Sequence, residues 1–176
     1  MTTVTQTACG TTSEAGISLT ADRGFGFTIQ TGYTKLISSS LSSIKMPLKK
    51  SSSGVITGIV EARVYNSSGV LQQSSDQFDV SSVTPSFVLY EFTFSTSHTL
   101  ANGDFIGVCR VSGGEPTMDL LIQFSDTTCY ANTNSAAINP PTITQYTSWD
   151  AIFEAELESS TSGGARLPPP PAFVRI

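Results

Sequence analysis

Several stretches of the chain alternate between apolar and polar residues, with the period of two that a half-buried β-strand produces. In FVLYEFTFS, one apolar face carries Val88, Tyr90, Phe92 and Phe94, whereas Glu91 and Thr93 share the other face. The same alternation runs through ITGIVEARVYN, AIFEAELES and SSIKMPLKK. FIGVCRVS and MDLLIQFS are apolar almost throughout, as strands covered on both faces are. We therefore expect strands, and no helix, because no apolar set keeps helical spacing for three turns.

Short polar turns such as YNSSGV, LANGDF, SGGEPT and NPPT separate these runs. Strands at short intervals predict an all-β antiparallel β-sandwich, jelly-roll-like, of about 8–10 strands in two sheets that cover one another. Pro47 predicts an edge position or a bulge, because proline cannot donate to a strand ladder. We expect the sandwich over residues 17–159, between an extended N-terminal arm (1–16) and a Gly/Pro-rich C-terminal arm (160–176).

The C-terminal arm reads STSGGARLPPPPAFVRI, a flexible spacer followed by a stiff segment and an apolar tip. Four consecutive prolines favour polyproline II and extend about 12 Å. In an assembly the tip can lie in a groove of a neighbouring subunit, with the arginine beside an acidic partner; packing on its own sandwich is the alternative. The predicted contact residues are Pro168, Pro169, Pro170, Pro171, Phe173, Val174, Arg175 and Ile176.

Charge and composition narrow the classes of partner. The formal net charge of −5 argues against a nucleic-acid partner, and the basic cluster Lys35, Lys45, Lys49 and Lys50 is typical of a solvated strand face. No run of about 18 apolar residues predicts a membrane span. The segment MTTVTQTACGTTSEAG has no signal-peptide pattern. We expect a place in a virion or on an extracellular surface; a piece cut from a longer exported protein fits the same sequence.

The three cysteines, Cys9, Cys109 and Cys129, lack the spacing of a zinc site. One disulfide and one thiol are compatible with this number, and the sequence leaves the pairing open. Cys109 lies in an apolar run, which favours a buried thiol.

Few residues suggest catalysis, and we expect no enzyme. His98 is the single histidine; with Asp104 and a nearby serine it would make a triad, but no GxSxG elbow accompanies it. Glu154, Glu156 and Glu158 line one strand face at a spacing compatible with glycoside hydrolysis. Charged residues on an edge strand that block unwanted pairing are the preferred interpretation of that run.

Two kinds of binding site remain. No cofactor or metal motif is present, although Asp76 with Asp79, or Asp119 with Asp126, leave a structural calcium ion open. Sugar binding by a sandwich needs exposed aromatic rings, and the candidates are Trp149, Tyr146 and Tyr130; the alternative is that Trp149 seals one end of the core. Asn66 begins a glycosylation sequon at a predicted hairpin tip.

The landmarks GFTIQTGYTKLISSSLSSIKMPLKK, GIVEARVYNSSGVL, LYEFTFSTSHTLANGDFIGVCRV and SWDAIFEAEL follow one another between Phe25 and Leu157. In this order they resemble the choice-of-anchor R type of domain and related jelly rolls shaped like carbohydrate-binding modules. The resemblance implies a non-catalytic β-sandwich on a cell or particle surface.

Two functions therefore stand as hypotheses. The first is a structural protein of a virus or phage particle or similar surface assembly, a capsid or decoration subunit joined to copies of itself or to other particle proteins by its terminal arms. The second is a glycan-binding or adhesion module of a surface or receptor-binding protein, with a role in host attachment.

Overall fold

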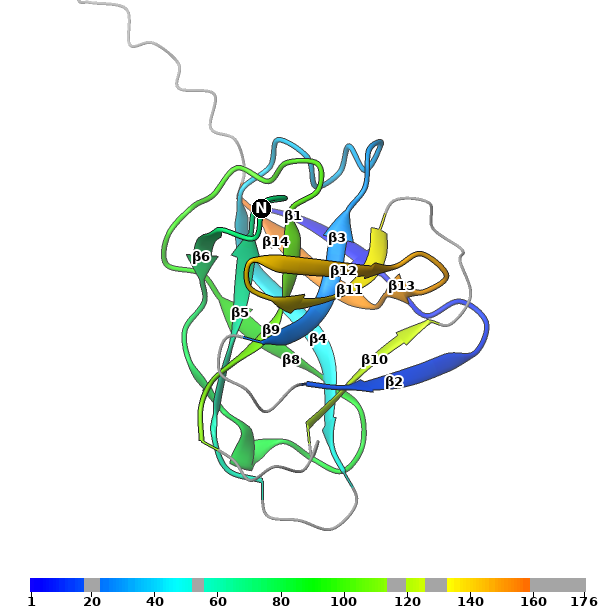
Figure 1. Cartoon of the computed structure of the whole chain (residues 1–176), viewed down its shortest axis with the longest axis vertical. Helices are drawn as coiled ribbons and strands as arrows, with labels where there is room; N and C mark the ends of the chain where they lie inside the picture. The colour runs from blue at the N-terminus through cyan, green and yellow to red at the C-terminus, as the bar shows by residue number, and fades with distance from the viewer. Residues whose placement is uncertain (18–22, 52–55, 114–119, 126–132, 159–176) are drawn as a thin grey trace, which may run out of the picture.

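The computed structural model describes residues 1–17, 23–51, 56–113, 120–125 and 133–158. Their strands pair antiparallel in two sheets that pack face to face, which confirms the predicted all-β sandwich (Figure 1). The only helical element in these ranges is a 3₁₀ turn, Val80–Ser82. The first sheet contains β1 (Thr2–Gln6), β2 (Thr12–Gly16), β4 (Leu41–Lys50), β8 (Val88–Thr93), β10 (Leu120–Ser125), β13 (Asp150–Ala151) and β14 (Phe153–Leu157). The second contains β3 (Gly24–Ile29), β5 (Ile59–Tyr65), β6 (Leu71–Ser74), β7 (Phe78–Asp79), β9 (Phe105–Ser112), β11 (Thr133–Asn139) and β12 (Thr142–Tyr146).

Eight of these strands form a jelly roll. In chain order they are β1, β3, β4, β5, β6, β8, β9 and β14, and the first pairs with the last. Inside that pair β3 pairs with β9, β4 with β8, and β5 with β6. Such nested pairing is that of a long hairpin rolled into two sheets, β1-β14-β4-β8 and β3-β9-β5-β6. The other strands, added to these eight, take the total above the expected 8–10.

Strands β10 to β13 form an insertion between the last two strands of the jelly roll. β10 pairs with the far end of β4, beyond the reach of β14, and carries β2 on its other side. Pro47 lies where β4 changes partner from β14 to β10. The prediction of an edge strand at Pro47 was therefore wrong: β4 is central, and the proline falls at a gap in the ladder.

The core lies between the two sheets and uses the apolar faces that the alternation predicted. The rings of Phe27 and Phe153, from opposite sheets, stack with centroids 4.5 Å apart, and both side chains are fully buried. Ile44, Met46 and Leu48 of β4 contribute one continuous inner row.

A second, smaller core covers the outer face of the second sheet, on the side away from the first. It contains Tyr65, Phe105, Cys109, Ala136 and Ile138, with Ile143 packed against them. Strands β3 and β9 separate β11 from β5 in the sheet, so the β11–β12 hairpin can reach β5 only by folding over this face. Figure 1 shows the hairpin lying across the sheet in this way.

Glycines make this fold possible, because a side chain on them would separate the strands. A Cβ on Gly26 would lie 2.0 Å from the carbonyl oxygen of Ile106, and one on Gly24 would lie 2.4 Å from that of Val108. Pro141 lies at the tip of the folded β11–β12 hairpin and contacts Gly69, in the turn between β5 and β6. A Cβ on Gly69 would lie 1.9 Å from the Pro141 carbonyl oxygen. The close approach of backbones therefore requires glycine at these positions.

The N-terminal residues differ from the expected arm, because residues 2–6 and 12–16 are strands of the first sheet. Thr2 to Gln6 pair with β14, and Thr12 to Gly16 pair with β10. The buried Gln6 amide donates to the Thr133 hydroxyl (2.7 Å) and to the Ala151 carbonyl (2.8 Å). These bonds tie the first strand to the insertion.

Candidate functional site

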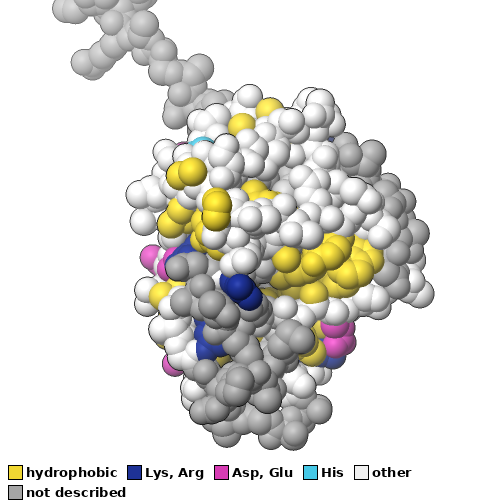
Figure 2. All heavy atoms as spheres, in the orientation of Figure 1, with side chains coloured by type: hydrophobic (Ala, Val, Ile, Leu, Met, Phe, Trp, Pro, Cys, Tyr) yellow, Lys and Arg dark blue, Asp and Glu magenta, His cyan; other side chains and the backbone are white. Residues whose placement is uncertain are grey.

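The structure brings together two of the three aromatic residues predicted to bind sugar. Tyr146 and Trp149 stack with centroids 4.6 Å apart, and Trp149 also stacks on Phe124 at 4.3 Å. Both are half-buried, and Figure 2 shows a hydrophobic patch on the viewed face near the ends of β12 and β13. Trp149 therefore packs against two other rings, as a residue that seals the core does. Tyr130 lies outside the described residues, and sugar binding stays a prediction.

Amide side chains meet on the second sheet, and Gln145 precedes Tyr146 in β12, so the two side chains point to opposite faces of that strand. The Gln145 Oε1 atom accepts hydrogen bonds from Asn134 Nδ2 (3.2 Å) and from Gln30 Nε2 (3.4 Å). Gln30 also donates to the Thr28 hydroxyl at 2.8 Å. Sequence reasoning missed this group, because the three amides come from segments more than ten residues apart and no local pattern unites them.

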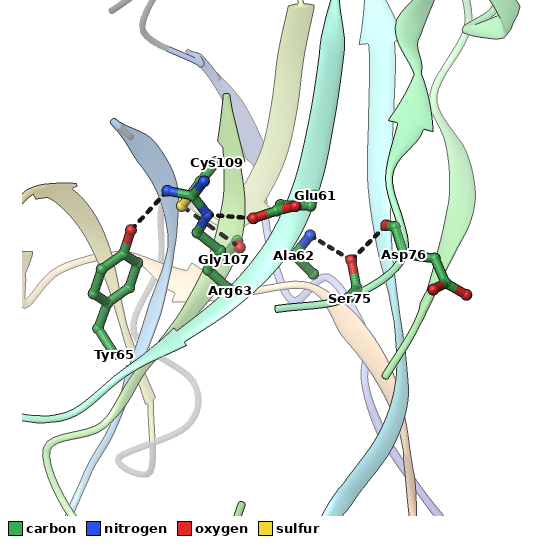
Figure 3. A network of polar contacts seen from close by, with 8 residues as sticks. All are labelled: Glu61, Ala62, Arg63, Tyr65, Ser75, Asp76, Gly107 and Cys109. Carbon is green, nitrogen blue, oxygen red and sulfur yellow. Dashed lines mark hydrogen bonds and ion pairs between the residues drawn. The ribbon is translucent and has the colours of Figure 1, made fainter. Parts of the chain in front are cut away.

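A buried ion pair lies on the outer face of β5 (Figure 3). Arg63 Nε donates to Glu61 Oε1 at 2.6 Å, and Arg63 Nη1 donates to the Tyr65 hydroxyl at 3.0 Å. The two charged side chains are only 10% and 9% exposed. The alternation correctly pointed both away from the main core; the folded hairpin, which no local pattern indicated, accounts for the second core beside them. Glu61 lies opposite Cys109, which is a buried thiol as predicted.

His98 and Asp104 are also brought together, with His98 Nε2 3.0 Å from Asp104 Oδ2. The same carboxylate oxygen accepts the backbone N–H of Ala101 at 2.9 Å. The Asp104 side chain is 3% exposed, and its hydrogen bond with Ala101 holds the 101–104 turn in place. A catalytic role for the pair stays untested.

The glutamate run lies in the interior of a sheet, so the prediction of a charged edge strand was wrong. β14 carries Glu154 and Glu156 and is paired on both sides, with β1 and with β4. Glu154 Oε1 accepts a hydrogen bond from Lys45 Nζ at 2.5 Å, and this bond raises the pKa of Lys45. Lys49 pairs with Glu14 in the same way on this outer face. Here the carboxylates therefore link strands of one sheet, β14 with β4 and, across β10, β2 with β4.

The aspartates considered for calcium are partly outside the described residues, namely Asp119 and Asp126. Asp79 caps the 3₁₀ turn by accepting the Ser81 N–H at 2.9 Å, which lowers the pKa of its carboxyl group. Within the described ranges no three His, Cys, Asp or Glu side chains gather in a way that could hold a metal ion.

Asn66 lies in the tight turn between β5 and β6, where the sequence placed it. Its Oδ1 atom accepts the N–H groups of Ser68 and Val70, both at 3.0 Å. The position at a hairpin is confirmed, and glycosylation stays a prediction.

The second side of β8 is open. β8 pairs with β4 on one side, and on the other Ser75 bridges Phe94 and the Asp76 N–H bonds the Thr93 carbonyl. From Val88 to Phe92 no strand of the described chain pairs with this side, which we call the β8 edge. Val88, which the alternation placed on the buried face, is 46% exposed at the start of the strand, and Leu89 is 44% exposed. An unpaired edge with exposed apolar side chains is a typical site of association between chains.

Cys9 is disulfide-bonded, and its backbone N–H donates to Ser125 Oγ at 2.8 Å. Cys129 and the C-terminal contact residues Pro168, Pro169, Pro170, Pro171, Phe173, Val174, Arg175 and Ile176 lie outside the described residues.

Comparison of the chain with protein-family models, with curated proteins and with solved structures finds no match. The resemblance to choice-of-anchor domains therefore stays a prediction. In the parts of the chain that are described, no helix has the length and apolar character needed to cross a bilayer.

Proposed function

We propose that this chain is a non-catalytic structural subunit of a virus or phage particle or a similar surface assembly, joined to its neighbours through its C-terminal arm. The observation that supports this best is the β8 edge. Natural sheets usually protect an open edge with charges, a bulge or a covering segment. Here Val88 and Leu89 are left to solvent instead, which favours a surface that a partner covers.

Two further features agree with this proposal. Disulfides such as that of Cys9 persist mainly in oxidising surroundings. The charged side chains described above are paired within the domain, as expected of a scaffold whose interactions reside at edges and arms.

The test is the mass of the full chain in solution, measured by light scattering over a range of concentrations. We expect oligomers for the intact chain and monomers after deletion of residues 163–176. A variant with Phe173→Ser, Val174→Ser and Ile176→Ser keeps the length of the arm and should also be monomeric. An intact chain that stays monomeric at high concentration, or a deletion variant that assembles equally well, overturns the proposal.

A glycan-binding module is the second candidate, favoured by the amides of Gln30 and Asn134, which both meet Gln145 on the second sheet. Amide groups donate and accept hydrogen bonds, which is chemistry that recognises sugar hydroxyls. A glycan array probed with the full chain and with Gln145→Ala tests it. Binding that the substitution weakens supports this function, and an array without any bound glycan rejects it.

A further inference from the structure

We propose that residues 172–176 of one copy add as a parallel strand to the β8 edge of a second copy. This inference rests on the proposed function and names the surface that receives the arm. The open part of the edge runs from Val88 to Phe92, five residues, and ends where Asp76 and Ser75 close it. The segment AFVRI that follows Pro171 contains no proline, so each of its residues has a backbone N–H group. An extended segment added to an open edge gains its main-chain hydrogen bonds from that edge.

The side chains of the two segments match in one direction. On β8, Leu89 and Glu91 face outward, because they lie opposite Pro47 and Lys45 on the outer face of β4. Glu91 is exposed, and its Oε1 atom accepts a hydrogen bond from Ser43 Oγ at 2.8 Å. Side chains that lie opposite each other on neighbouring strands stabilise the pairing when they carry opposite charges or are both apolar.

In a parallel alignment Arg175 lies beside Glu91, and Phe173 lies beside Leu89. Val174 and Ile176 then point to the other face, beside Tyr90 and Phe92. In an antiparallel alignment with the same charge pair, Phe173 would instead reach Thr93, where the Asp76 N–H already occupies the edge. Charge and shape therefore favour the parallel direction.

The direction of the chain favours a second copy over the arm's own domain. β14 ends at Leu157, opposite Leu41, and this is the end of the sheet where β8 finishes. To run parallel to its own β8, the arm would have to turn back along the sandwich and then reverse again directly after four prolines. Polyproline is stiff and resists such a turn. A second copy placed end to end receives the arm without a reversal.

An arm that leaves one end of a subunit and binds the side of the next is a heterologous contact. Contacts of this kind produce closed rings or open filaments, whereas a twofold dimer requires a self-complementary patch. The assembly should therefore contain rings or filaments and no predominant dimer.

The experiment exchanges the charges in the full chain. Glu91→Arg and Arg175→Glu should each raise the concentration at half-assembly about tenfold, and the double variant should restore it to within about threefold of the unchanged chain. Glu156→Arg is the matched control, since it makes the same charge change on the outer face of the interior strand β14. Circular dichroism and thermal unfolding confirm that each variant folds, and hydrogen exchange measures protection of the β8 amides on assembly.

The outcomes separate the two proposals. If removal of the arm abolishes assembly but Glu91→Arg behaves like Glu156→Arg, the arm binds elsewhere; the inference is then wrong and the proposed function stands. If the double variant does not recover, the charge pair is wrong and the alignment falls with it. A monomeric intact chain with protected β8 amides would mean that the arm covers its own edge, which overturns both proposals.

Discussion

Replacement of Arg63 by methionine tests whether the outer face of β5 is as dry as its packing indicates. The substitution keeps an apolar stem but removes the hydrogen bonds that the guanidinium donates to Glu61 (2.6 Å) and to Tyr65 (3.0 Å). Glu61 is 9% exposed and would keep a buried charge without its cation. Loss of one partner of a buried ion pair costs about 3–5 kcal/mol. For a chain of this size, each kcal/mol lowers the midpoint of thermal unfolding by about 2–4 °C, so we expect a fall of roughly 6–20 °C.

A double-mutant cycle with Glu61→Leu isolates the pair from the packing. Apolar replacement of a whole buried pair is often neutral or stabilising, so Glu61→Leu with Arg63→Met should recover most of the stability lost by Arg63→Met. Urea unfolding followed by circular dichroism measures all four proteins. A loss below about 1 kcal/mol for Arg63→Met would show that water reaches Glu61. Additive losses in the double variant would show that the two side chains are not coupled.

Three further substitutions test the fold. Gly26→Ala should destabilise the domain by at least about 2 kcal/mol in urea unfolding, because its Cβ would lie 2.0 Å from the Ile106 oxygen; an unchanged midpoint would mean that β3 and β9 are less close. Phe27→Ala, at the stack with Phe153, should cost about 3–5 kcal/mol, and a smaller loss would indicate a core that collapses around the gap. Asp79→Ala removes a carboxyl group whose pKa is lowered from its usual 3.8 by the hydrogen bonds from Ser81. The stability that the ionised carboxylate contributes is therefore fully present above pH 3.8. It is lost as the pH falls through the lowered pKa of the folded state. Unfolding midpoints should therefore differ between wild type and Asp79→Ala at pH 7 and converge near pH 2, and a gap that persists at pH 2 would contradict the charge-dependent cap.

The period of two predicted β4, β5, β8 and β14 and the side of each that faces the core, whereas the residues of β1 and β2 were expected in an arm. Ile44, Met46 and Leu48 are all buried, as their alternation with Lys45 required. The pattern could not say which strand neighbours which, because pairing is decided by contacts between distant segments. The glutamates of β14 illustrate this limit: an outward charged row looks the same on an edge strand and on an interior strand.

The folded β11–β12 hairpin was beyond prediction for a related reason. Gly24 and Gly26 let β3 and β9 approach closely in the sheet that the hairpin covers, and a glycine in a strand is equally compatible with a bulge, a bend or a weak position. Only the paired strands show that these glycines adjoin β9. The candidate site follows the same rule. The pairing of His98 with Asp104 was suggested by their closeness in sequence, whereas the amides that meet at Gln145 were not.

The open β8 edge links the fold to the proposed assembly. The two sheets of the jelly roll, β1-β14-β4-β8 and β3-β9-β5-β6, end in β1, β8, β3 and β6, and these border strands are covered unequally. β1 carries threonines toward solvent and β12 belongs to the folded hairpin, while β8 exposes Val88 and Leu89 next to Glu91. A domain that needed only to remain monomeric would gain from a lysine at either apolar position, since an edge charge opposes pairing without disturbing the core. Because the edge has no such lysine, the substitution Leu89→Lys is informative. If the β8 edge is a contact surface, the full chain with Leu89→Lys should no longer assemble, although its unfolding midpoint is unchanged. Unchanged oligomers in this variant would place the contact on another part of the molecule.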